Sequence, residues 1–154
     1  MKTFSMLALA FSGAVLFSPT VQAGDKVLTA DNPTWRAECT TCHLAYPPQL
    51  LDAESWRALM AGLNRHFGVD ASVDTKSAAA IGDFLERHAG NRRKYADGRP
   101  VLRISETRWF RREHDEVAAS VWSRPTIKSA ANCAACHREA ERGDYAERNI
   151  RIPK

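Results

Sequence analysis

The chain has 154 residues, a formal net charge of +4 and 44% hydrophobic residues. This length excludes a large multidomain protein and fits one domain or two small lobes. The modest positive charge is poor evidence for nucleic-acid binding, and no stretch after residue 23 is apolar enough to cross a membrane.

The first 23 residues have the pattern of a secretory signal peptide. Lys2 supplies a positive start, and Phe4 to Phe17 is an apolar run too short to span a bilayer. Val21 to Ala23 matches a small-x-small cleavage site. We therefore expect the mature chain to begin at Gly24 and to be located in the periplasm or an equivalent exported space.

Two copies of a Cys-x-x-Cys-His motif organise the chain, at residues 39–43 and 133–137. This motif is typical of c-type haem attachment. Two thiols on one helical turn can reach the vinyl groups at one edge of a porphyrin, and the adjacent histidine can then bind the iron. The four cysteines of the chain all lie in the motifs: Cys39, Cys42, Cys133 and Cys136. The sequence therefore predicts two covalently attached haem c groups, with His43 and His137 as proximal ligands.

Three other uses of the cysteines fit less well. A redox dithiol is expected beside a βαβ pattern, which this sequence lacks. A disulfide framework does not predict two-residue gaps followed by histidine. A histidine directly beside a cysteine is awkward for one tetrahedral zinc ion.

Apolar residues recur at helical spacing along most of the chain, and no segment has the pattern of a sheet. We expect helices at Trp35 to Cys42, Asp52 to Phe67, Asp74 to Ala89, from a Ser105 cap past Phe110, His114, Val117 and Val121, and from Ser129 or Asn132 to about Arg142. Residues 91–100 are charged and rich in turn formers, which indicates a linker. We predict a mainly α fold of short helices around two haems, with lobes at 24–97 and 98–154.

The axial ligand opposite each proximal histidine decides whether the iron is open or closed. Met60 is the only methionine after the leader, and its place on an apolar helix face favours a core role. Three histidines remain as distal candidates, His66, His88 and His114. His114 lies on an apolar face, His66 lies at a helix end, and His88 can instead serve as a cation at a helix C-terminus.

The positions of two candidates are symmetrical about the motifs. His66 follows His43 at the same separation at which His114 precedes His137. This spacing favours local pairing, His43 with His66 and His114 with His137. A crossed pairing and a role for His88 both stay open on this reasoning.

At this point the chain resembles the proteobacterial dihaem cytochrome c family, soluble periplasmic electron carriers with two histidines at each haem. The resemblance rests on segments 65–72 (RHFGVDAS), 109–114 (WFRREH), 132–137 (NCAACH) and 150–153 (IRIP). It implies that His66 and His114 are the distal ligands and that His88 is an extra histidine. It also implies a redox partner, either a small oxygen-binding monohaem cytochrome c or a membrane cytochrome b.

We therefore expect an electron carrier rather than an enzyme, with two low-potential haems because neither iron has a methionine ligand. Many arginines would neutralise haem propionates, so nucleic acid is not an expected partner, and stable membrane insertion is not expected either. One alternative is a haem enzyme or gas-binding sensor with one open iron. Another is an electron-transfer subunit of a periplasmic reductase.

Overall fold

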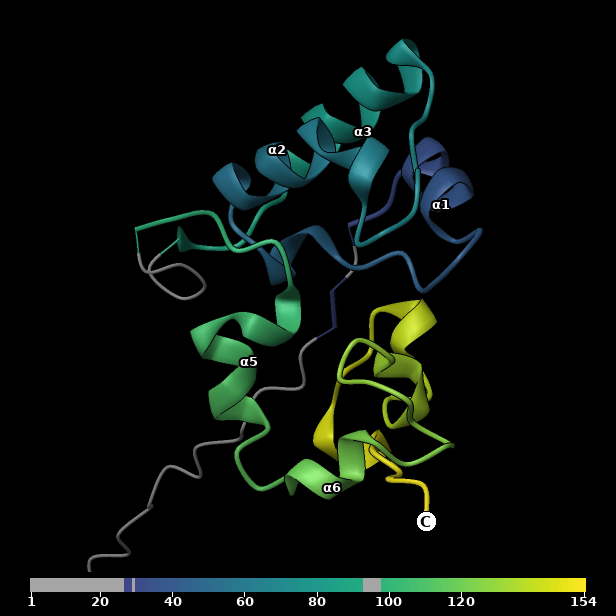
Figure 1. Cartoon of the computed structure of the whole chain (residues 1–154), viewed down its shortest axis with the longest axis vertical. Coiled ribbons are helices and arrows are strands. Elements are labelled where there is room, and N and C mark those ends of the chain that lie inside the picture. The colour runs from purple at the N-terminus through teal and green to yellow at the C-terminus, as the bar shows by residue number, and fades with distance from the viewer. Residues whose placement is uncertain (1–26, 29, 93–97) are drawn as a thin grey trace, which may run out of the picture.

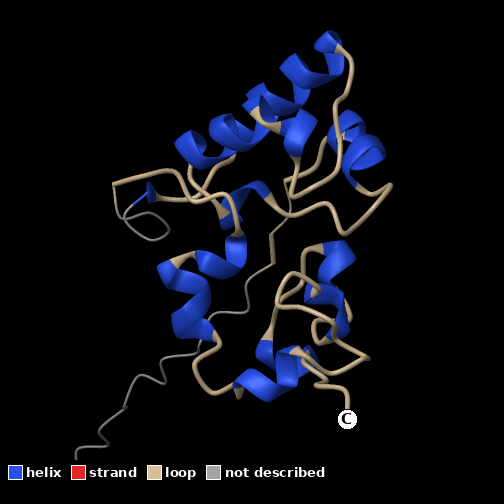
Figure 2. Ribbon diagram, in the orientation of Figure 1, coloured by secondary structure: helices blue, strands red, loops and turns tan. Residues whose placement is uncertain are grey.

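The structure is a computed structural model that describes residues 27, 28, 30–92 and 98–154 (Figure 1). Helices and loops make up this part of the chain, and its β pairing is limited to isolated bridges (Figure 2). The predicted mainly α fold class is therefore confirmed. The predicted signal peptide at 1–23 and the middle of the predicted linker, 93–97, lie outside the described residues.

Three helices form the core of the N-terminal part of the molecule. They are α1 (Pro33–Cys39), α2 (Ala53–Ala61) and α3 (Thr75–Arg87), with the 3₁₀ turn η1 (Pro48–Leu50) between the first two. Helix α3 packs against both α1 and α2 (Figure 1). Their buried residues form one cluster, made of Trp35, Ala45, Leu51, Trp56, Ile81, Phe84 and Leu85.

Local capping signals explain where these helices begin. The side chain of Asn32 accepts a hydrogen bond from the Trp35 amide at 3.0 Å. The carboxylate of Asp52 accepts one from Ser55 N at 2.7 Å, and that of Asp74 does the same for α3. Each cap satisfies a backbone N–H that the first helical turn leaves without a partner. The predicted starts at Asp52 and Asp74 are therefore confirmed.

The helix predicted from Asp52 to Phe67 is shorter than expected. Helix α2 ends at Ala61, Gly62 is its C-cap, and a separate 3₁₀ turn, η2 (Leu63–Arg65), follows. Glycine has a low helix propensity. The apolar spacing continues past the break because both segments line the same cavity.

The C-terminal part is built from shorter elements. They are η3 (Ile104–Glu106), α5 (Arg108–Glu113), α6 (Ala119–Trp122), η4 (Cys133–Ala135), η5 (Ala140–Arg142) and η6 (Glu147–Asn149). The cap predicted at Ser105 is wrong, because the buried Thr107 hydroxyl accepts from Phe110 N at 3.0 Å and donates to Ile104 O at 2.8 Å. The continuous helix predicted up to Arg142 is also wrong, since only η4 and η5 form there.

Contacts far apart in sequence tie the two parts together. Leu28 N donates to Gly143 O at 2.8 Å, and Val101 N donates to Ser55 Oγ at 2.9 Å. Gly143 has φ 74°, and a Cβ there would collide with the Leu28 carbonyl, so only glycine fits. The division into lobes at 24–97 and 98–154 stays a prediction. Within the described residues, no helix combines the length and apolar character that a bilayer span requires.

Candidate functional site

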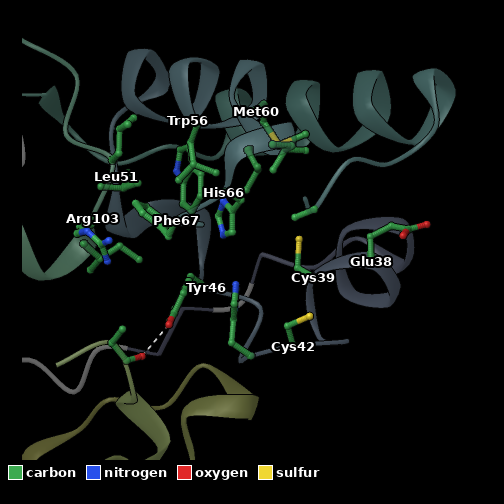
Figure 3. Close-up of a pocket in the computed structure, with 18 of the residues that line it drawn as sticks. Glu38, Cys39, Cys42, Tyr46, Leu51, Trp56, Met60, His66, Phe67 and Arg103 are labelled. Atoms are coloured by element: carbon green, nitrogen blue, oxygen red, sulfur yellow. Dashed lines mark hydrogen bonds between the residues drawn. The ribbon is translucent and has the colours of Figure 1, made fainter. Parts of the chain in front are cut away.

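The first cavity lies where the end of α1 faces α2 and the segment that follows it (Figure 3). Cys39 is the last residue of α1, and Cys42 and His43 follow in the next turn. Cys39 and Cys42 lie at one end of the cavity, whereas Phe67 and Arg103 lie at the other. The structure therefore places both cysteines and the histidine of the first motif in the lining of this cavity.

His43 and His66 face each other across this cavity. Their ring centres are 6.1 Å apart and their planes are 27° from parallel. Metal–imidazole bonds are about 2 Å long, so this gap matches two imidazoles on opposite sides of one metal ion. His43 Nδ1 donates to the Leu44 carbonyl at 2.7 Å, which leaves Nε2 as the nitrogen available to a metal.

A strained turn holds His66 in place. Phe67 has φ 51°, a left-handed conformation that is uncommon for a residue with a bulky side chain, and Gly68 follows with φ 101°. Val69 N donates to His66 O at 3.1 Å and closes the turn. The Arg103 guanidinium lies 3.9 Å from the centre of the Phe67 ring, a cation–π contact that helps to fix the ring. Strain of this kind is typical of functional sites.

The second cavity has the same arrangement of histidines. The ring centres of His114 and His137 are also 6.1 Å apart, with the planes at 76°. His114 Nδ1 donates to the Phe110 carbonyl at 2.9 Å, and its ring stacks on Phe110 with centres 4.0 Å apart. The second motif contributes Cys133 and Cys136 to the same cavity. In each cavity, the two histidines that the spacing favoured as a pair therefore lie opposite each other.

The two remaining ligand candidates, His88 and Met60, occupy different places. His88 is the C-cap of α3, its ring contacts Phe84 at 5.0 Å, and it lines neither cavity. Met60 does line the first cavity, on α2. His66 lies opposite His43 at ligand spacing, however, so Met60 is better explained as part of the apolar wall.

Three of the four cysteines, Cys39, Cys133 and Cys136, have raised thiol pKa values. Burial, with a contribution from Glu38, raises the pKa of Cys39 to about 11. Burial also raises the pKa of Cys133 to about 11 and raises that of Cys136. A reactive dithiol needs a lowered thiol pKa in a basic environment. The arrangement therefore argues against a catalytic dithiol.

Burial also favours the neutral form of His66 and of His137, one histidine from each facing pair. It lowers the pKa of His66, and the charges of His43 and Arg103 lower that pKa further. It lowers the pKa of His137 as well, where His114 adds to the effect and Asp144 opposes it. Neutral imidazole is the form that binds a metal.

The walls of the two cavities suit a large, flat, apolar group. Of the five large hydrophobic residues that are exposed in the described part of the chain, all but Val27 line a cavity: Phe67, Val69 and Leu102 the first, Ile152 the second. In the second, three buried polar atoms have no hydrogen-bond partner within the described residues, Gln49 Oε1, Tyr145 Oη and His137 Nδ1. Both cavities thus offer apolar walls that fit the haem ring, and the second also offers polar atoms that a bound group could partner.

The two cavities share a wall. Ile104, Ala130 and Cys133 line both of them. The Tyr46 ring stacks on His43 with centres 4.8 Å apart, and its hydroxyl donates to the Ala131 carbonyl at 2.6 Å (Figure 3). Burial, with a smaller effect of Cys133, raises the pKa of Tyr46 to about 12. Groups bound in the two cavities would therefore be close neighbours.

Trp35 and Tyr46, which flank the first motif in the sequence, both line the first cavity. Sequence reasoning missed the contact of Arg103 with Phe67 and the Phe110 carbonyl as the acceptor for His114. The four-residue spacing of Phe110 and His114 could have suggested the second contact. No local signal pointed to the first, because it joins residues that are distant in sequence.

Comparisons with known proteins agree with this geometry. A family model described as dihaem cytochrome c matches residues 35–145. The solved structure of a diheme cytochrome c from Rhodobacter sphaeroides is 44% identical, with a TM-score of 0.70 over 77% of this chain and 99% of its own. A diheme cytochrome type c from Shewanella baltica OS155 is 37% identical, with a TM-score of 0.70 over 79% of this chain and 93% of its own. No curated protein sequence gives a significant match.

Proposed function

The chain belongs to the dihaem cytochrome c family and carries two covalently bound haem c groups, and from this premise we propose that it is a periplasmic electron carrier with two bis-histidine haems. Membership of the family implies electron transfer. We assign His43 and His66 as the axial ligands of the first iron and His114 and His137 as those of the second.

One observation supports this assignment more than any other. Each proximal histidine of a Cys-x-x-Cys-His motif faces a second histidine at 6.1 Å between ring centres. With four imidazoles at two irons, both would be six-coordinate and neither would offer a free position to oxygen or peroxide. Closed irons suit a carrier rather than an enzyme.

When bound, each haem supplies an iron that cycles between the ferric and ferrous states by one electron. The chain's own residues hold and orient it. Cys39 and Cys42, or Cys133 and Cys136, would provide the thioether links, and the Nδ1–H bonds of His43 and His114 leave Nε2 of each ring available to the iron. Arg103, at the end of the first cavity away from its cysteines, provides a cation for a propionate.

The remaining parts of the proposal concern export, the division into lobes and the redox partner. We propose that residues 1–23 direct export and are removed, and that the haem sites belong to lobes at 24–97 and 98–154. The partner would be another redox protein, a small monohaem cytochrome c or a membrane cytochrome b. Contact at an exposed haem edge would give the small interface that is typical of redox encounters.

A redox titration tests the proposal. We expect both midpoint potentials to lie well below the range of His/Met cytochromes, because a methionine ligand raises the potential and none is bound. A Met60→Leu variant should titrate like the wild type, since Met60 serves only as a wall. A midpoint in the His/Met range for either haem, moved by Met60→Leu, would show that the ligand assignment is wrong.

A further inference from the structure

Tyr46 joins the two haem-attachment motifs through space. Its ring stacks on His43, with the ring planes 21° from parallel, and its hydroxyl donates to the carbonyl of Ala131, which lies 85 residues away in the chain. This inference rests on the proposed function and concerns how electrons move inside the carrier. We infer that Tyr46 is a positioning residue for electron transfer between the two haems.

The acceptor carbonyl connects directly to the second motif. Ala131 O accepts a hydrogen bond from Cys133 N at 3.1 Å, and Cys133 Sγ lies 3.7 Å from the same oxygen. The Ala131 carbonyl oxygen therefore accepts two hydrogen bonds. One comes from Tyr46, which stacks on His43, and the other comes from the backbone of Cys133, which would attach the second haem. The path from His43 to Cys133 contains one ring stack and two hydrogen bonds.

Packing on both sides of this contact holds it in place. Tyr46 is part of the segment that packs against the N-terminal core. Ile104, Ala130 and Cys133 form the wall that the two cavities share on either side of the contact. The hydrogen bond from Tyr46 joins a residue that stacks on the first motif to a residue whose carbonyl binds the second motif. Losing it would free the first proximal imidazole to shift relative to the second attachment segment.

The step that Tyr46 serves is a one-electron exchange. With both haems bound, one electron would pass from a ferrous iron to a ferric iron, and no bond would form or break. Tyr46 keeps its proton throughout, because it is the donor of the hydrogen bond to Ala131. Its contribution is to hold the two redox centres at a fixed separation and orientation.

The test compares two variants of the complete holoprotein. Tyr46→Phe keeps the ring beside His43 and removes only the hydroxyl. Ser129→Ala is the matched control, since Ser129 Oγ accepts from Ala131 N at 3.3 Å and so contacts the same alanine without reaching the first motif. Two-dimensional exchange NMR of the half-reduced protein, read at the haem methyl resonances, gives the rate of exchange between the haems.

We expect Tyr46→Phe to slow interhaem exchange several-fold and Ser129→Ala to exchange at the wild-type rate, with low-spin spectra in both. Wild-type exchange in Tyr46→Phe would overturn the inference, even if the variant were less stable, because a purely structural role lowers stability alone. Equal slowing in both variants would overturn it too. An open iron in the wild-type protein would instead contradict the proposed function, so the two failures are distinguishable.

Discussion

Replacing His66 by alanine is expected to let carbon monoxide bind at one of the two haems. The imidazole of His66 lies across the first cavity from His43 at ligand spacing, and the side chains around it are apolar. Met60, the other ligand candidate in that wall, is not expected to replace it, because Met60 packs against the buried cluster of the N-terminal part. The reduced variant should give a carbon monoxide difference spectrum with the amplitude of one haem per chain.

The matched control for this variant is His88→Ala. His88 caps α3 and contacts Phe84 outside both cavities, so its loss should leave the visible spectrum unchanged with and without carbon monoxide. The assignment would be wrong if His88→Ala opened an iron. It would also be wrong if His66→Ala stayed fully low-spin and indifferent to carbon monoxide.

Loss of the second haem is expected to unfold the C-terminal part of the chain. The buried hydrophobic residues of 98–154 are few, namely Phe110, Ile127, Ala140 and Ala146. The segment around the second motif has only single 3₁₀ turns, which isolated chains do not sustain. Small cores bury too little apolar surface to be stable without added cross-links or cofactors. The haem in the second cavity must therefore supply much of this core.

The variant Cys133→Ala/Cys136→Ala tests this by removing both thioether links. Limited proteolysis with trypsin should then cut after Arg138, Arg142 and Arg148 faster than in the native protein, because an unfolded backbone enters the protease site more readily. The comparison variant, Cys39→Ala/Cys42→Ala, should keep more structure at its own site, because α1, α2 and α3 share a buried cluster. Native resistance of the C-terminal part without its haem would contradict the expectation.

Elements with strong local signals were predictable from the sequence. The starts of α2 and α3 follow from aspartate caps, which act within one helical turn. The end of α2 was misplaced because the apolar spacing continues through Gly62, along a wall that faces a cavity rather than a helix. Between Cys133 and Arg142 no large apolar residue is available for burial, so the predicted long helix lacks the packing that would stabilise it.

The candidate site was more predictable than the fold. Motif spacing and a count of histidines left three distal candidates and favoured local pairing, and the family resemblance then implied His66 and His114, which do face the motif histidines in the cavities. The turn at Phe67, the contact of Arg103 and the link from Tyr46 to Ala131 could not be foreseen, because each depends on backbone conformation or on pairing across the chain. They concern how the ligands are held rather than which residues they are.

The most direct test of the central claim is the visible absorption spectrum of the purified protein, oxidised and then reduced, with and without carbon monoxide. Two bis-histidine haems predict low-spin bands in both states and no change when carbon monoxide is added. A high-spin component, or a shift on addition of carbon monoxide, would mean that at least one iron is open. That result would contradict the carrier assignment and favour a haem enzyme or gas sensor.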